Sequence, residues 1–170
     1  MAAALKSSPQ FFSPAPMLTP LATFRHLFPA LIALLLIGSA CAQTGPQPTL
    51  PTRRLTAGMH VITAELATTP QSRTIGMMFR EKTAPNHGML FVFEYKGPQC
   101  FWMRNTPLPL SIAFIDDDGT ILQINDMAPK TENLHCSQRP VRYALEMEQG
   151  WFAKKGAAIG SRIGGLPALN

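Results

Sequence analysis

The sequence predicts a mostly-β domain: a small antiparallel β-barrel or sandwich with one or two short helices. Short runs rich in valine, isoleucine, phenylalanine and threonine recur after residue 58, and turn residues separate them. Helical periodicity is confined to short stretches of the chain. The charged fraction of 15% and the hydrophobic fraction of 46% are those of a globular domain rather than of a disordered chain.

The expected strands follow one another closely along the chain. They cover residues 59–66, 88–93, 100–105, 110–116, 120–125 and 141–147, with a last short strand after residue 160. The run 88–93 is apolar without interruption, which indicates a strand buried on both faces. Pro107 and Pro109 cannot donate to a ladder, so they favour a sheet edge for the segment before them.

Two helices and one tight turn complete the pattern. Residues 70–80 favour a short amphipathic helix, because Thr69 can cap it and Pro70 suits its first position. Residues 151–155 can form a single helical turn before Gly156. The pair Asp118-Gly119 predicts a hairpin with a type I′ turn between the strands 110–116 and 120–125.

Residues 1–42 have the pattern of a secretory signal peptide. Arg25 precedes the apolar run 30–37, and small residues follow it. The run is shorter than the roughly 20 residues that a membrane-spanning helix needs. Translation from Met17 would give a leader of ordinary length. Two processing routes stay open: cleavage before Gln43, or a bacterial lipoprotein route with acylation of Cys41.

Residues 43–57 are rich in proline and are expected to be a linker, which leaves residues 58–170 as the folded domain. The leader predicts a periplasmic protein, either soluble or held to a membrane by a lipid. Membrane contact is expected only through the leader or that lipid anchor.

Charge and motifs exclude several classes of function. The net charge is +5, and the basic residues are scattered rather than gathered in a stripe, so nucleic acid is not an expected partner. No cofactor-binding loop is present, and no CxxC or HxxxH spacing indicates a metal site. Asp116, Asp117 and Asp118 lack the remainder of a calcium loop and are expected to be solvated turn residues.

Cys100 and Cys136 are the cysteines of the expected domain. Two thiols in a small exported domain usually pair, so we predict a disulfide between them. Two alternatives stay open: one buried and one exposed free thiol, or a metal site that adds His135.

Several ordered segments carry a family resemblance. They are residues 73–80, 88–93 and 101–106, then 112–116 with Asp118-Gly119, and 144–147 with Gly150. Together they resemble the domain of unknown function 192, also called UPF0127, over about residues 58–165. The resemblance implies a compact β-rich prokaryotic domain, exported or membrane-associated, with no established activity. Arg104 stands where the family pattern usually has lysine. Ser111 stands where it usually has aspartate, which puts in doubt any mechanism that needs a carboxylate there.

We expect a contact cluster for a small polar ligand or glycan, formed by Arg80, Trp102, Arg104, Asn105 and Thr106. An indole stacks on sugars and other flat ligands, and the neighbouring groups supply hydrogen bonds. Structural roles stay open for four of these residues. Arg80 can pair with Glu81, Glu94 or Glu146, Trp102 can be core, and Asn105 with Thr106 can serve the local turn.

The leading hypothesis is therefore a non-enzymatic accessory domain of the cell envelope that needs no cofactor. A rival hypothesis is an envelope hydrolase that uses Asp116 and Glu146 as its catalytic carboxylates. In a structural role, Glu146 would instead pair with an arginine. A third hypothesis is a purely structural protein. Burial of both Trp102 and Asn105 in the core would favour it.

Overall fold

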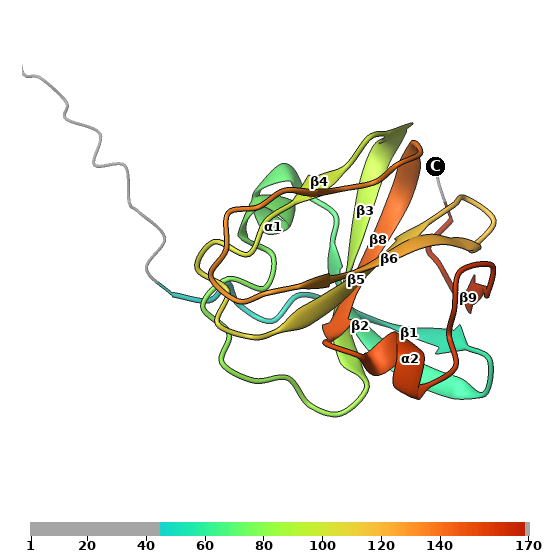
Figure 1. The fold of residues 1–170 in the computed structure, drawn as a ribbon, viewed down its shortest axis with the longest axis horizontal. Coiled ribbons are helices and arrows are strands. Elements are labelled where there is room, and N and C mark those ends of the chain that lie inside the picture. Colours follow the sequence, from blue (N-terminus) through green and yellow to red (C-terminus); the bar gives the residue numbers. More distant parts are fainter. Residues whose placement is uncertain (1–44, 169–170) are drawn as a thin grey trace, which may run out of the picture. The chain divides into compact units, whose positions relative to one another are not determined.

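The computed structural model describes residues 45–168, which form a curled sheet of seven strands and a separate two-stranded ribbon (Figure 1). The signal peptide and Cys41 lie outside the described residues. The sheet has the order β6-β5-β8-β3-β2-β1-β9, and β2 with β3 is its parallel pair. Its strands are β1 (Thr52–Ala57), β2 (His60–Ala67), β3 (His87–Gly97), β5 (Leu110–Ile115), β6 (Ile121–Met127), β8 (Val141–Glu148) and β9 (Ile163–Gly164).

The two edges of the sheet meet through backbone hydrogen bonds. Thr120, just before β6, forms a bridge with Arg162, just before β9. The Ile121 N–H donates to the Ser161 carbonyl at 2.8 Å, and the Gly160 N–H donates to the Ile121 carbonyl at 2.9 Å. The curled sheet thereby protects both of its edges. The predicted fold class, mostly β with two short helices, is confirmed.

Each face of the sheet has its own apolar core, because successive side chains of a strand point to opposite faces. The inner core contains Leu55, Ile62, Leu90, Leu145 and Phe152, and helix α2 (Trp151–Lys154) contributes to it. The outer core contains Met89, Phe91, Met103, Ile112, Phe114 and Ala144. The expected burial of the run 88–93 is found for Gly88–Phe91, while Val92 and Phe93 are half-buried.

The ribbon of β4 (Cys100–Phe101) and β7 (His135–Cys136) lies near α1 in Figure 1. A disulfide joins Cys100 to Cys136, which also face each other in the strand register. The predicted strand 100–105 is therefore shorter than expected and lies outside the main sheet. The reason is local, because the Met103 N–H already donates to the Thr131 carbonyl and Asn105 has a left-handed φ of 57°.

Helix α1 (Pro70–Ile75) is shorter than the predicted helix over 70–80. Its start follows the prediction: the Ser72 N–H donates to Thr69 Oγ1 at 3.1 Å and the Thr69 N–H donates to Ser72 Oγ at 3.0 Å. Its end is set by Gly76, whose φ of 50° and ψ of −130° are not helical. A Cβ at Gly76 would also lie 3.2 Å from Phe91 Cζ, so the residue allows α1 to approach β3 closely.

Two further expectations differ from the structure. Strand β1 lies inside the range 43–57 that was predicted to be a linker. The sequence did not indicate it, because only Leu55 and Ala57 of its six residues are buried and its apolar signal is weak. The hairpin at Asp118-Gly119 is present, but its turn is not type I′. Gly119 has a positive φ of 91° while Asp118 does not, which is the pattern of a type I turn followed by a left-handed glycine.

A half-buried ion pair links the loop after α1 to β2. Arg80 Nη2 donates to Glu65 Oε2 at 2.8 Å, and Arg80 Nη1 donates to Glu65 Oε1. The Leu50 N–H also donates to Glu65 at 2.9 Å. Burial acts to raise the pKa of Glu65, but the hydrogen bonds from Arg80 and Leu50 outweigh it and lower that pKa. Arg80 therefore pairs internally, but with Glu65 rather than with Glu81, Glu94 or Glu146.

We expect Arg80→Leu to lower the free energy of unfolding by about 2 to 4 kcal/mol, because it leaves the Glu65 carboxylate half-buried without a counter-ion. The double variant Arg80→Leu/Glu65→Leu should recover more than half of that loss. Urea unfolding at neutral pH measures both, with Arg54→Leu on the exposed face of β1 as the control. Equal losses in the single and double variants would contradict this account.

Candidate functional site

A cavity of about 470 Å³ lies between α1, β3, β4 and the middle of β8. We call it the Glu146 cavity. Its polar lining includes Arg73, Thr74, Gln99, Thr106 and Glu146. Its apolar lining includes Ile75, Met78, Phe91, Phe93, Phe101 and Trp102. Mostly apolar walls with a few polar groups are typical of sites for small molecules.

Glu146 is the unusual member of this lining. It lies on the outer face of β8, and its register partners on the two neighbouring strands are Met89 and Ile112. Its exposed fraction is 4%, and its carboxyl group has no hydrogen-bond or ion-pair partner within residues 45–168. Burial raises the pKa of its carboxyl to about 8. The expected arginine partner is therefore absent, and the carboxyl is largely protonated at neutral pH.

Aromatic side chains form the walls around this carboxyl. Phe101 packs edge-on against Phe91, with ring centroids 4.9 Å apart, and against Phe93 at 6.3 Å. Trp102 is 39% exposed, so it is not a core residue. Its indole N–H has no partner in the described part of the chain. Trp102 thus presents an open aromatic surface at the edge of the cavity.

The position of Trp102 is fixed from outside the cavity. The Arg104 guanidinium stacks on the indole at 4.3 Å from the ring centroid. Arg104 also makes a two-pronged ion pair with Glu132, at 2.9 and 3.0 Å. Lysine, the usual residue of the family pattern at this position, cannot form such a fork, so the arginine of this chain changes the contact as well as the charge distribution.

The five predicted contact residues do not share one cavity. Trp102 and Thr106 line the Glu146 cavity, whereas Arg104 and Asn105 line a second cavity of about 650 Å³. Phe79 and Lys130 also line this second cavity. Arg80 lines neither of the two. The expected single hollow is therefore divided, with the Trp102 and Arg104 stack between its two halves.

Asn105 and Thr106 also serve the local turn. The left-handed Asn105 offers its carbonyl to the Phe79 N–H at 2.7 Å. Thr106 is buried, and its hydroxyl donates to the Arg104 carbonyl at 3.3 Å. The Lys130 N–H donates to the Thr106 carbonyl at 3.0 Å. The side-chain bond to the local backbone that was expected as an alternative is therefore present for Thr106, whereas Asn105 serves the turn through its backbone.

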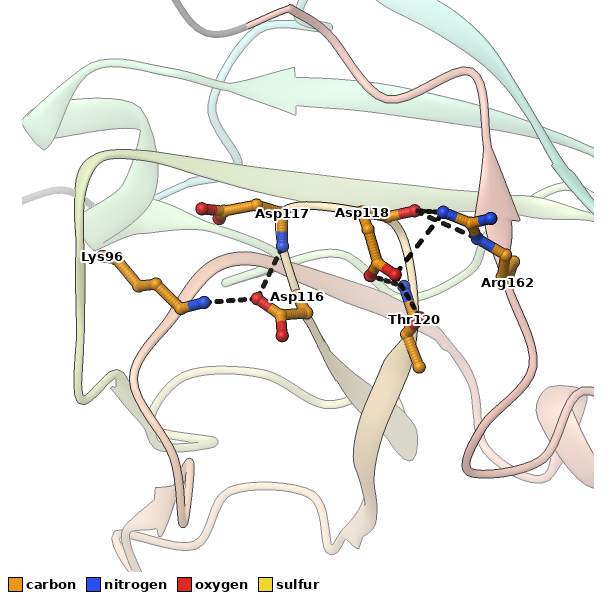
Figure 2. Close-up of polar contacts among 6 residues, drawn as sticks. All are labelled: Lys96, Asp116, Asp117, Asp118, Thr120 and Arg162. Carbon is orange, nitrogen blue, oxygen red and sulfur yellow. Dashed lines mark hydrogen bonds and ion pairs between the residues drawn. The ribbon is translucent and has the colours of Figure 1, made fainter.

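Asp116, the other candidate catalytic carboxylate, belongs to the hairpin turn at the end of β5. Figure 2 shows that Lys96 and the Asp117 N–H both donate to it, and these bonds hold the pKa of Asp116 below its usual value. Asp118 is likewise engaged by Thr120 and Arg162. These acids are turn residues, as the sequence indicated.

The predicted pairing of Asp116 with Glu146 is not found. Ile112 lies opposite Glu146 in the sheet, and Asp116 is further along β5 by four residues. At about 3.3 Å per residue this corresponds to roughly 13 Å. Glycosidase carboxylates lie within about 9.5 Å of each other. The two acids also do not line a common cavity, so the geometry does not support a carboxylate-pair hydrolase.

Ser111 occupies the position where the family resemblance leads one to expect aspartate. Its hydroxyl bonds to the carboxylate of Asp126, its register partner on β6, and accepts the Gly150 N–H at 2.9 Å. The neighbouring strand thus supplies a carboxylate beside the serine. The hydroxyl is engaged in joining β5, β6 and the start of α2.

Two features are absent from residues 45–168: a cluster of metal ligands and a helix able to span a membrane. That part of the chain contains no group of three or more histidine, cysteine, aspartate or glutamate side chains placed to hold a metal ion. Neither α1 nor α2 has the length and apolar character required to cross a membrane.

Sequence reasoning missed several lining residues, above all Arg73 and Gln99. Arg73 belongs to the segment 73–80 that carries the family resemblance, but its chemistry was not singled out. Gln99 lies just before the expected strand 100–105 and was not considered as a site residue. The phenylalanines of β3 and β4 were expected to be core. Pattern reasoning could not find them, because their proximity depends on how α1 and the ribbon pack on the sheet.

Comparisons with known proteins identify a family and two similar solved structures. The family model DUF192, described as "Uncharacterized ACR, COG1430", matches residues 53–165. A crystal structure from Sinorhizobium meliloti 1021, described as that of a candidate transcription regulator, is 38% identical, with a TM-score of 0.66. The match covers 70% of this chain and 97% of that one.

A protein of unknown function from Novosphingobium aromaticivorans DSM 12444 is similar at 30% identity and a TM-score of 0.65. That match covers 70% of this chain and 90% of the other. No curated protein matches the sequence. The family model spans most of the chain and includes both walls of the Glu146 cavity, and the chain belongs to the DUF192 family.

Proposed function

We propose that this domain is an exported, non-enzymatic accessory module of the cell envelope that binds a small polar ligand, such as a sugar unit of a glycan, in the Glu146 cavity. One observation carries the proposal. A carboxyl group with 4% exposure and no protein partner lines a cavity with aromatic walls. Buried polar groups normally have partners, so an unpartnered one beside open space favours an external partner.

The chemistry of the cavity suits an uncharged hydroxyl-bearing group. With a pKa of about 8, the Glu146 carboxyl is mostly neutral at pH 7, so it both donates and accepts a hydrogen bond. The Trp102 indole N–H and the Gln99 side-chain amide also lack partners within residues 45–168. The aromatic rings complement the apolar face of a sugar or another flat molecule. Polar groups and flat walls together favour a saccharide over a purely apolar ligand.

Export is proposed from the leader pattern, and the disulfide supports it. Structural disulfides persist in oxidising compartments such as the bacterial periplasm. The bond between Cys100 and Cys136 holds the ribbon that forms one wall of the cavity. We therefore place the ligand in the periplasm, with membrane contact only through the leader or an acylated Cys41.

A purely structural role is less favoured, because Trp102 is not sealed in the core. Burial of its ring would have been the simplest outcome for an aromatic residue between Phe101 and Met103, both of which pack in the outer core. Instead the ring is held by Arg104 and partly exposed beside the cavity. An exposed aromatic group held at a fixed position is what a binding site requires.

The pH dependence of the free energy of unfolding, compared between the wild type and Glu146→Gln, tests whether the buried carboxyl is neutral. The pKa of Glu146 is about 8 in the folded protein and near 4.5 when the group is exposed. At pH values between these two, the folded state therefore binds one proton that the unfolded state has released. The free energy of unfolding of the wild type should fall as pH rises through this window, by roughly 3 to 5 kcal/mol relative to Glu146→Gln. Urea unfolding of both proteins at about pH 5 and about pH 9 measures the difference.

Gln keeps the size and hydrogen-bonding groups of a neutral glutamic acid, so the variant should match the wild type at about pH 5. A difference between the two proteins that stays constant from about pH 5 to pH 9 would show that Glu146 is ionised in the folded state. The polar-ligand argument would then lose its basis.

Binding itself is tested with Trp102→Ala. A thermal-shift and calorimetric screen of glycan fragments should give ligands whose affinity falls at least about tenfold in this variant, because the stacking surface is lost. Tyr95→Ala is the matched control, since Tyr95 is an exposed aromatic residue outside the Glu146 cavity. Ligands that bind both variants as they bind the wild type, or a screen with no ligand, would remove the proposed function.

A further inference from the structure

Arg73 is a cation in the wall of the Glu146 cavity that has no acidic partner. Its Nη1 group donates to the Thr68 carbonyl at 2.6 Å and to the Val92 carbonyl at 2.8 Å. Its guanidinium carbon lies 5.2 Å from the centroid of the Phe93 ring. No carboxylate within residues 45–168 forms an ion pair with it. Backbone carbonyls and an aromatic ring therefore fix the group without neutralising its charge.

Other cations of the domain behave differently. Ion pairs with acids are formed by Arg80, Lys96, Arg104, Arg142 and Arg162. Arg54 and Lys130 lack such pairs and are exposed to water. Arg73 is half-buried and lines a cavity. Arg80 is also half-buried, but it is paired with Glu65, whereas Arg73 has no acidic partner within residues 45–168.

The unused donors of Arg73 suit a carboxylate. A guanidinium has five N–H groups, and both protein hydrogen bonds use Nη1. The Nε and Nη2 donors have no protein partner in the described residues. Two parallel N–H donors of this kind bind a planar carboxylate in a fork, which a lysine cannot do. A guanidinium that is already held in place also loses less conformational entropy when it binds.

The charges of the cavity favour a single negative group. Its ionisable lining residues are Arg73 and Glu146. Glu146 lies among Met89, Phe91 and Ile112, where an ionised carboxyl is disfavoured, and it makes no ion pair with Arg73. A neutral acid beside a fixed cation leaves the cavity with about one positive charge. The complementary ligand is a monoanion.

We propose that the ligand of the Glu146 cavity is a small carboxylate that carries a ring with an apolar face, of the kind represented by a uronic acid unit, and that Arg73 binds its carboxylate while Trp102 contacts the ring. This inference rests on the proposed function and adds the charge of the ligand to it. Arg73 is then the residue that determines specificity for an acidic over a neutral ligand.

The experiment compares matched ligands that differ in charge. Methyl glucuronide is compared with methyl glucoside, and benzoate with benzyl alcohol, by calorimetry on the full domain at neutral pH. We expect the carboxylate of at least one pair to bind at least about tenfold more tightly than its neutral partner. Arg54→Gln should keep that preference, since Arg54 is exposed and outside the cavity.

Arg73→Gln should abolish the preference and leave the affinity for the neutral partner within about threefold. Arg73→Lys keeps the charge without the fork and should retain only part of the preference. Circular dichroism and thermal unfolding establish that both variants are folded, and Arg73→Lys alone decides the question if Arg73→Gln does not fold.

The outcomes separate the two proposals. The charge inference would be overturned if neutral ligands bound as tightly as the carboxylates. If that binding depended on Trp102, the proposed function would remain intact. A carboxylate preference that survives in both Arg73 variants would also overturn the charge inference. Failure of all four probes to bind at about 10 mM would overturn the carboxylate assignment, and the wider glycan screen with Trp102→Ala then decides the proposed function separately.

Discussion

The burial of an unpaired carboxyl group on β8 is the constraint on which the outer layer of this domain depends. Glu146 lies in a sheet position whose neighbours Met89 and Ile112 are fully apolar. An ionised carboxylate is very costly in such surroundings, and the group remains there because it keeps its proton. The structure does not cover this face with a continuous apolar core. It leaves a cavity, open to solvent, beside the carboxyl.

The cavity exists because the outer layer is attached at its margins. Helix α1 is fixed by its capping box and by the buried Gln47, whose amide donates to the carbonyls of Ser72 and Gly76 at 3.1 and 2.9 Å. The ribbon of β4 and β7 is fixed by the disulfide and by the reciprocal hydrogen bonds of Gln99 and Ser137. The site therefore lies between two separately secured elements, and the rigid sheet provides the wall that contains Glu146.

The sequence was a good guide to the fold and a partial guide to the site. Short runs rich in β-branched and aromatic residues, separated by turn residues, located most strands, because these residue types fit a pleated sheet. β1 was missed because its side chains are mostly exposed, and β4 was overextended because Asn105 turns the chain. Trp102 and Thr106 do line the cavity with Glu146, but Arg104 and Asn105 do not. That division follows from tertiary packing, since adjacent residues of one short segment can lie on opposite sides of an aromatic ring.

The distribution of ion pairs gives an independent reason to regard the Glu146 cavity as a site. Where this chain needs electrostatic links, it makes them: Arg80 with Glu65, Lys96 with Asp116, and Arg104 with Glu132. Arg73 and Glu146 line one cavity, yet they form no ion pair with each other or with another residue of 45–168. A purely structural pair would satisfy both groups and close the space, because buried polar groups without partners reduce stability. A carboxyl without a partner and a cation without an acidic partner, both beside one open volume, support the proposal of a ligand from outside this chain.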